Sequence, residues 1–287
     1  MLFYKFTIII NIYVIRCVDR NAVRIDNDDD TTRAQGDSNM KNNTWLTDKY
    51  VAHRGLFDNI TLPENSLAAF ENAVKNNFAI EMDVQMTKDG VLVVFHDDEM
   101  SRMTSLKGDI REKSYDEIKD ACLLGTQHKI PTFEQFLECI NGRTQLVIEI
   151  KTHKNIGTVE QKVLDVLSGY TGEYCIESFN PLIVRWFKVH APNIVRGQLS
   201  YDFKDAPFGR LKKRMLSHLW LCKWNGSQFI AFDEQSVAEN KAVARYRKKI
   251  PVICWTVKSQ QRLDFLEQYC DNVIFDSFLP ERRDLDN

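Results

Sequence analysis

The sequence lacks an excess of charge of either sign. Its 38 Lys and Arg residues nearly balance its 40 Asp and Glu residues, which gives a formal net charge of -2 at pH 7. Proteins that bind nucleic acid over a broad surface carry a basic footprint. We therefore exclude nucleic acid as a partner and expect any phosphate group to be bound at one local site.

The sequence also lacks paired cysteines. Seven cysteines lie far apart, at positions 17, 122, 139, 175, 222, 254 and 270. An odd number of scattered cysteines without a CxxC pair favours neither a disulfide framework nor a zinc site. We expect small buried hydrophobic residues in a reducing compartment, which predicts a cytoplasmic protein.

No hydrophobic run is long enough to cross a bilayer. The longest, at residues 6–15, has about ten apolar residues where a spanning helix needs about 20. The polar segment that follows has little that could pack and is predicted to be disordered. We expect residues 1–39 to be an upstream extension and residues 40–287 to be the domain. The alternatives are a weak membrane anchor through residues 1–16, or a cleaved leader of a secreted protein, although no clear cleavage site follows.

What the sequence does contain is a regular alternation of strand-like and helix-like segments. The strand-like runs are residues 50–52, 79–84, 145–151, 173–179, 194–199, 229–232, 251–257 and 272–276. Eight such units in about 240 residues predict an α/β fold of the TIM (β/α)8 barrel type. A doubly wound open sheet is the alternative, but its first strand is usually followed by a glycine-rich turn that is missing here. Residues 91–130 predict a strand pair and then a short irregular insertion after the second strand.

Ionisable side chains gather where the predicted strands end. His53 and Arg54 follow the first strand, and Glu149 and Lys151 end the third. Catalytic residues of TIM barrels lie at the carboxyl ends of the strands. These positions therefore predict a site at the mouth of the barrel.

The second strand predicts a metal site at this mouth. Its alternation places Glu81 and Asp83 on one face, where Glu149 joins them from the third strand. Three carboxylates in a partly dry site need a counter-charge, and ligation by oxygen alone favours Mg²⁺ or Ca²⁺ over zinc. We therefore expect one divalent cation.

The remaining polar residues suit a phosphate ester. Arg54 and Lys151 would place positive charge beside a phosphate group. His53 and His96 have the ordinary pKa that suits a general acid and base near neutral pH. Together with the cation, these residues predict phosphoester chemistry.

Each of these features also has a purely structural interpretation. A Glu-x-Asp pair is common on a solvated strand edge, and His96 followed by Asp97 is common in a turn. Pro63 to Asn65 is typical of a helix start, and Trp255 of a large core side chain. The other histidines, His128, His153, His190 and His218, are interpreted as surface or packing residues.

Taken together, the motifs resemble those of the glycerophosphodiester phosphodiesterase family, whose barrel is similar to that of the phosphatidylinositol-specific phospholipases C. The matching stretches, in family order, are "AHRG" (52–55), "PENS" (63–66), "IEMDVQMTKDGVLVVFHDDEMSRMT" (80–104), "IPTFEQFLE" (130–138), "LVIEIK" (146–151), "ESFN" (177–180), "CWTV" (254–257) and "VIFDSFLPE" (273–281). The resemblance covers nearly all of residues 49–281. It departs at Lys258, where the family often has Asn, at Ser66, where the family usually has Thr, and in the short segment between Thr104 and Ile130.

The resemblance implies a role for each matching residue. Glu81, Asp83 and Glu149 would bind the divalent cation, with Glu64 in or beside this ligand set; His53 and His96 would be general base and acid; Arg54 and Lys151 would bind the phosphate, and Trp255 would line the pocket. The family's reaction hydrolyses a small glycerophosphodiester to glycerol 3-phosphate and an alcohol, through attack by the substrate's own glycerol hydroxyl. Alternatives are lysophospholipase D-type hydrolysis of lysophospholipids and a catalytically inactive barrel that serves as a binding module.

Overall fold

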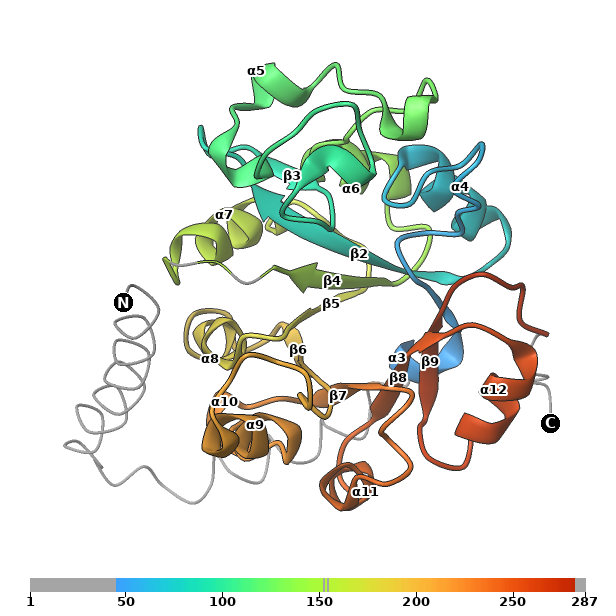
Figure 1. Cartoon of the computed structure of the whole chain (residues 1–287), viewed down its shortest axis with the longest axis vertical. Helices are drawn as coiled ribbons and strands as arrows, with labels where there is room; N and C mark the ends of the chain where they lie inside the picture. Colours follow the sequence, from blue (N-terminus) through green and yellow to red (C-terminus); the bar gives the residue numbers. More distant parts are fainter. Residues whose placement is uncertain (1–44, 152, 154, 282–287) are drawn as a thin grey trace. The chain divides into compact units, whose positions relative to one another are not determined.

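The computed structural model describes residues 45–281 except 152 and 154 (Figure 1). They belong to one compact unit, Asn43–Asn287. The predictions of an anchor, leader or disordered extension at residues 1–39 fall outside the described residues. Within the described part, no helix is both long and apolar enough to cross a membrane.

Eight parallel strands form a closed barrel. In barrel order they are β1 (Val51–Ala52), β2 (Ala79–Met86), β4 (Leu146–Ile150), β5 (Tyr174–Ser178), β6 (Val195–Ser200), β7 (Phe229–Asp233), β8 (Val252–Val257) and β9 (Asn272–Phe275). The sheet closes because β1 pairs in parallel with both β2 and β9. This closure confirms the predicted TIM barrel and excludes the open doubly wound sheet.

One helix precedes the first strand, and the other helices follow strands around the barrel (Figure 1). The helices are α3 (Trp45–Asp48), α4 (Leu67–Lys75), α6 (Phe133–Ile140), α7 (Thr158–Leu167), α8 (Pro181–His190), α9 (Arg210–Ser217), α10 (Cys222–Asn225), α11 (Lys241–Arg247) and α12 (Gln260–Leu266). Several begin at side-chain caps: the hydroxyl of Ser66 accepts a hydrogen bond from the Ala69 N–H, and Thr132 forms a capping box with Gln135. Apolar residues at helical spacing bury one face of α4, α6, α7 and α8.

The barrel interior is apolar towards the amino-terminal ends of its strands. Its core comprises Val51, Ala79, Val147, Cys175, Leu199, Phe229, Ala231, Ile253 and Ile274, together with Leu46 from α3. Side chains on a strand alternate between its two faces. The residues two positions further along each strand therefore face the same interior, nearer the carboxyl end. These are the positions that carry the polar residues of the site.

The insertion after β2 has a core of its own. Strand β3 (Leu92–Val94) pairs antiparallel with β2, as predicted. The turn between them includes Gly90 at φ +86°, a left-handed conformation that glycine adopts without strain. Short helical turns follow, namely η2 (Met100–Arg102), η3 (Ile110–Glu112), α5 (Tyr115–Ile118) and η4 (Leu123–Gly125). They bury Val93, Phe95, Met100, Met103, Ile110, Ile118, Leu123 and Ile130 together.

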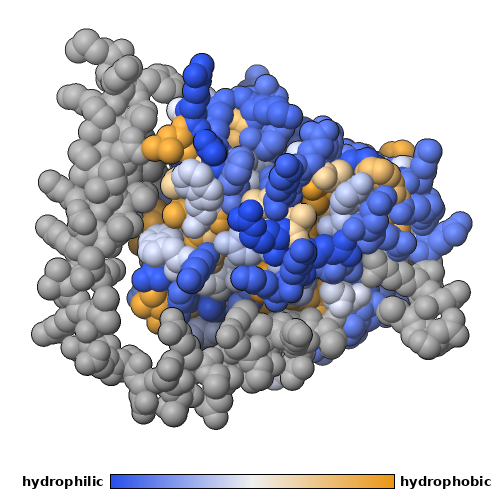
Figure 2. Space-filling view, turned by 90° about the horizontal axis from the view of Figure 1, so that it is seen from below, coloured by the Kyte–Doolittle hydropathy of each residue, from blue (hydrophilic) through white to orange (hydrophobic). Residues whose placement is uncertain are grey.

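The surface and the cysteines fit an ordinary globular domain. On the face shown in Figure 2, hydrophilic residues predominate and hydrophobic residues form small patches among the described atoms. The described cysteines are all free thiols, and Cys175, Cys222, Cys254 and Cys270 are buried. They pack as small hydrophobic residues.

Candidate active site

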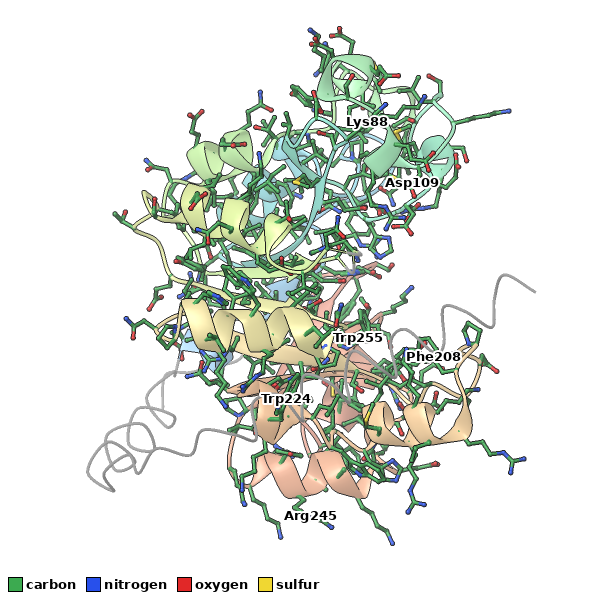
Figure 3. The ribbon with its side chains drawn as sticks, turned by 90° about the vertical axis from the view of Figure 1, so that its left-hand side faces the viewer. Lys88, Asp109, Phe208, Trp224, Arg245 and Trp255 are labelled. Carbon is green, nitrogen blue, oxygen red and sulfur yellow. The ribbon has the colours of Figure 1, made fainter. Side chains whose placement is uncertain are left out.

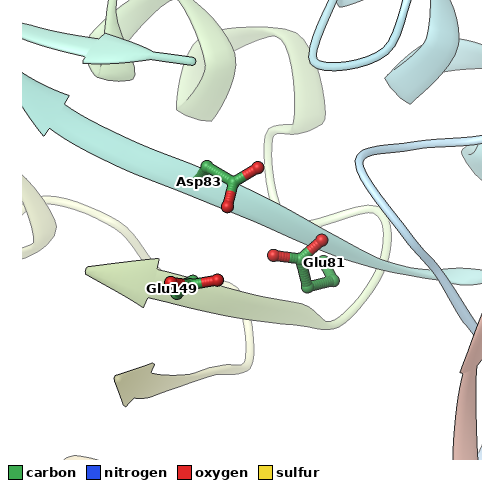
Figure 4. Close-up of side chains that lie close together, drawn as sticks. All are labelled: Glu81, Asp83 and Glu149. Atoms are coloured by element: carbon green, nitrogen blue, oxygen red, sulfur yellow. The ribbon is translucent and has the colours of Figure 1, made fainter. Parts of the chain in front are cut away.

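Three carboxylates converge near the carboxyl ends of two adjacent strands (Figure 4). Glu81 and Asp83 lie on β2, and Glu149 lies on β4 directly beside Asp83 in the register. One oxygen from each lies within 4.8 Å of the other two. As whole residues they are 3%, 1% and 8% exposed, so all three are buried. The structure thus brings together the three acids predicted as metal ligands.

The electrostatics of this cluster are unbalanced. Burial, followed by repulsion from Asp83 and Glu149, raises the pKa of Glu81 well above its usual range. Burial also raises the pKa of Glu149. Burial acts in the same direction on Asp83, but Lys151 and Arg54 outweigh it and hold the pKa of this carboxyl far below its usual range. Buried oxygen donors at these distances, with insufficient counter-charge, fit a hard divalent cation.

Two cationic side chains flank the carboxylates. Lys151 Nζ lies 2.7 Å from Asp83 Oδ1 and 3.0 Å from Glu149 Oε2. The backbone N–H of Arg54 donates to Glu81 Oε2 at 3.0 Å. Arg54 Nε is buried without a hydrogen-bond acceptor, 3.5 Å from Asp83 Oδ2. A buried donor without an acceptor is costly, and an anion in the site would satisfy it.

His53 is oriented by a residue from the last strand. Its Nδ1 lies 2.9 Å from Asp276 Oδ2, and its Nε2 lies 4.0 Å from Glu81 Oε2. Burial lowers the pKa of His53 although the bond to Asp276 opposes the shift. The imidazole is therefore mainly neutral at pH 7, with Nε2 directed towards the three carboxylates.

His96, like His53, has an aspartate carboxylate beside its Nδ1. Its Nδ1 lies 2.6 Å from Asp97 Oδ1, and burial lowers the pKa of its imidazole. The side-chain amide of Gln85 donates to the carbonyl oxygens of Phe95, His96 and Asp97, at 3.0, 3.1 and 2.9 Å. These bonds fix the loop that carries His96.

Glu64 is held by two arginines and lies outside the three-carboxylate cluster. It accepts hydrogen bonds from Arg54 Nη1 at 2.6 Å and from Arg102 Nη2 at 2.7 Å. Burial alone would raise the pKa of Glu64, but these two cations outweigh burial and lower the pKa to about 2. The geometry shows that Glu64 positions Arg54; its role as a metal ligand stays a prediction.

Trp255 lies near the end of β8. It packs against the barrel core and forms an edge-to-face contact with Phe179, with ring centroids 5.4 Å apart. Its indole Nε1 is buried without a partner among the described residues. The side chain thus packs as a core residue near the end of its strand, and its expected role in lining the substrate pocket stays a prediction.

Several residues that lie beside the predicted site residues were not predicted from the sequence. Asn65 donates to Asp83 Oδ2 at 2.8 Å, although its segment was interpreted as a helix start. That start is real, since Ser66 caps α4. Asp276, Arg102 and the buried Glu177, which pairs with Glu149 in the register, were not singled out. Asp276 and Glu177 lie at strand ends, which is the signal that could have identified them.

Comparison with known proteins assigns the fold and site to a class. The model of the glycerophosphoryl diester phosphodiesterase family matches residues 53–278. A glycerophosphodiester phosphodiesterase from Bacillus altitudinis is 32% identical over 176 residues, which cover 57% of this chain and 71% of the relative. Another, from Caldanaerobacter subterraneus subsp. tengcongensis, is 38% identical over 160 residues, 52% of this chain and 65% of the relative.

Solved structures share the fold. A phosphodiesterase from Oleispira antarctica, in complex with the product sn-glycerol-3-phosphate, has a TM-score of 0.65 at 24% identity. The match covers 81% of this chain and 94% of the Oleispira antarctica chain. A glycerophosphodiester phosphodiesterase from Parabacteroides distasonis has a TM-score of 0.66 at 22% identity, and the match covers 79% of this chain and 92% of the other chain. The fold and the family match together define an enzyme of the phosphoric diester hydrolase class. Within that class, the chain belongs to the glycerophosphoryl diester phosphodiesterase family.

Proposed function

We propose that this enzyme is a metal-dependent glycerophosphodiester phosphodiesterase that releases sn-glycerol 3-phosphate and an alcohol. The observation that carries this proposal is the convergence of three buried carboxylates with two cations and two oriented imidazoles at one end of the barrel. The names of the bacterial relatives and the product bound to the Oleispira antarctica enzyme support the substrate class.

The donor set favours a divalent cation of the Mg²⁺ or Ca²⁺ kind. Glu81, Asp83 and Glu149 would hold it, because each offers a buried carboxylate oxygen. When bound, the cation would withdraw charge from the phosphate oxygens as a Lewis acid. It would also offset the burial and the like-charge repulsion that together raise the pKa of Glu81.

Arg54 and Lys151 would orient the phosphate. The buried Nε of Arg54 lacks an acceptor, and a non-bridging phosphate oxygen would provide one. Lys151 Nζ is held between Asp83 and Glu149, at the edge of the carboxylate cluster. Preorganised donors of this kind stabilise the charge that develops on phosphorus-bound oxygens.

The two histidines would move protons between Nε2 atoms and the reacting oxygens. The imidazole nearer the glycerol hydroxyl accepts its proton as the oxygen bonds to phosphorus. The other imidazole enters this step protonated on both ring nitrogens, and its Nε2 donates a proton to the leaving alcohol oxygen as the bond of that oxygen to phosphorus breaks. This step leaves a cyclic phosphate of glycerol. Water then opens the cyclic phosphate with the two roles reversed. Asp276 and Asp97 keep Nδ1 of each ring protonated, which leaves Nε2 to exchange protons.

Product analysis tests this proposal. The purified chain should convert glycerophosphocholine to sn-glycerol 3-phosphate and choline in equal amounts. His53→Ala and His96→Ala should each lower kcat by roughly 10² to 10⁴ if they act as acid and base. His190→Ala, an exposed histidine on α8, is the matched control and should keep full activity. Absence of turnover in the folded wild type would favour the inactive binding module.

A further inference from the structure

A long stretch of the chain around helix α9 contains no acidic residue. From Ala206 to Phe232 there is no Asp or Glu, although the whole chain has 40. Helix α9 lies in this stretch and carries four cationic side chains, those of Arg210, Lys212, Lys213 and Arg214. Within the described part of the chain, none of the four forms an ion pair: Lys213 Nζ donates to the backbone carbonyl of Lys204, whose own side chain pairs with Asp202. The surface around α9 is therefore positive, in contrast to the net charge of -2 of the whole chain.

Packing on the barrel does not explain the composition of α9. Ser217 is its only buried residue, and the two apolar residues before it are half-buried. By comparison, α8 buries Ile183, Val184 and Phe187. A helix that packs on a core buries a wide apolar stripe, and α9 has no such stripe. Its cationic side chains and its first apolar residue are instead turned to its outer side.

Two large apolar side chains are exposed beside these cations. Leu211 is 73% exposed and Trp220, which follows the helix, is 51% exposed. Leu211 and Arg214 are three positions apart, so they share one side of the helix. The guanidinium group of Arg214 lies over the ring of Trp220, 5.9 Å from its centroid. We call Leu211, Trp220 and the four cationic side chains the α9 face.

The α9 face lies beside the mouth of the barrel. Residues 201–209 leave the carboxyl end of β6 and lead directly into α9. Ring contacts run along this loop, from Phe179 at the end of β5 to Tyr201, Phe203 and Phe208. Lys212 Nζ lies 3.9 Å from the ring centroid of Phe208, which is labelled in Figure 3. Packed rings thus connect the first turn of α9 to the end of the barrel that carries the candidate active site.

We propose that the α9 face binds an anionic phospholipid surface and holds the mouth of the barrel beside it. A helix with cations and exposed Leu or Trp is typical of proteins that lie in the interface of an anionic membrane. Its cations would lie level with the lipid phosphates, where each Lys or Arg strengthens binding roughly fivefold. Leu211 and Trp220 would enter the boundary between headgroups and acyl chains. A nucleic acid or an acidic protein would also attract the cations, but it would offer Leu211 no apolar surroundings.

Sedimentation with phospholipid vesicles tests this inference. The full chain should bind vesicles of equal parts phosphatidylglycerol and phosphatidylcholine about tenfold more tightly, or more, than vesicles of phosphatidylcholine alone. In about 1 M NaCl the difference should disappear, because charges are then screened within about 3 Å. Equal binding of the wild type to both kinds of vesicle at low salt, or binding to neither, would overturn the inference.

Two double variants of the α9 face separate charge from apolar contact. Arg210→Gln with Arg214→Gln should weaken binding to the mixed vesicles about 25-fold. Leu211→Ala with Trp220→Ala should weaken it several-fold, because the apolar contact with the interface is lost. Both variants should melt at the wild-type temperature, since the four side chains are exposed.

Each double variant has a matched control elsewhere on the surface. Lys241→Gln with Arg245→Gln removes two exposed charges from α11, and Arg245 is labelled in Figure 3. Val189→Ala shortens an apolar side chain on α8 that is 58% exposed. Both controls should bind the mixed vesicles as the wild type does.

The variants also distinguish a lipid surface from other ligands. An equal loss of binding in the α9 and α11 charge variants would show that binding follows overall charge, which would overturn the inference. Unchanged binding of both α9 variants would overturn it too, and would assign the membrane contact to another part of the chain. A loss on removal of charge but none on removal of Leu211 and Trp220 would favour a polyanion instead of a lipid surface. Vesicle binding does not require hydrolysis, so each of these failures would leave the proposed function standing.

Discussion

His53 Nδ1 lies 2.9 Å from Asp276 Oδ2, although 223 positions separate the two residues in the sequence. The contact exists because β1 and β9 pair and close the barrel. Hydrogen bonds and opposite charge hold the pKa of Asp276 below its usual value despite burial, so its carboxylate can only accept. Nδ1 of His53 must then carry the proton, and Nε2 is the nitrogen that faces the carboxylate cluster.

Removal of Asp276 should therefore impair catalysis without unfolding the barrel. We expect Asp276→Ala to lower kcat about 10- to 100-fold, less than the loss of a histidine, because the imidazole stays present but is poorly oriented. KM should change little. Steady-state kinetics with glycerophosphocholine measure both constants, and Asp264→Ala, an acid on α12, serves as control. An unchanged kcat would show that Asp276 does not orient His53.

Neutralising one member of the carboxylate cluster should separate stability from activity. In the presence of a chelator, Glu81→Gln should unfold at the same temperature as the wild type or a higher one, because the substitution removes like-charge repulsion. Activity should be lost. Thermal unfolding in EDTA checks this, with the exposed Glu138→Gln as control. A large drop in melting temperature would indicate that Glu81 has a structural role instead.

Glu64 should make stability depend on pH. Its pKa is about 2 in the folded protein, against an ordinary value of 4.5, because Arg102 and Arg54 hold it ionised. A lowered folded pKa contributes stability above pH 4.5, and that stability is lost as the pH falls towards 2. Glu64→Gln removes this contribution.

Urea unfolding measures the effect of Glu64. The quantity of interest is the unfolding free energy of the wild type minus that of Glu64→Gln. We expect this difference to be about 2 kcal/mol larger at pH 7 than at pH 3. Glu71→Gln, whose parent side chain pairs with Arg143 at the surface, should show a much smaller difference. A gap between wild type and Glu64→Gln that is the same at both pH values would contradict the assigned ion pairs.

Much of the fold followed from the sequence because its signals are local. Each barrel strand is a short apolar run, and alternation alone placed Glu81 and Asp83 on one face. The ends of strands in a barrel meet at one mouth, so Glu149 could be added without knowledge of the packing. The same rule applied to Asp276 and Glu177 would have found them, but a single acid at the end of a strand is a weak signal.

Other contacts could not be predicted because they depend on the path of irregular segments. Arg102 reaches Glu64 across 38 positions, from a short helical turn of the insertion. Asn65 binds Asp83 only because the loop before α4 folds over the end of β2. Neither periodicity nor turn chemistry encodes such paths. The packing of the insertion core determines them.

Metal binding tests the central claim most directly. Isothermal titration of chelator-treated protein with Mg²⁺ or Ca²⁺ should show one divalent ion bound per chain by the wild type and a greatly weakened site in Asp83→Asn. Addition of the ion should also restore hydrolysis of glycerophosphocholine. Full activity in excess EDTA, with no ion bound, would contradict the account.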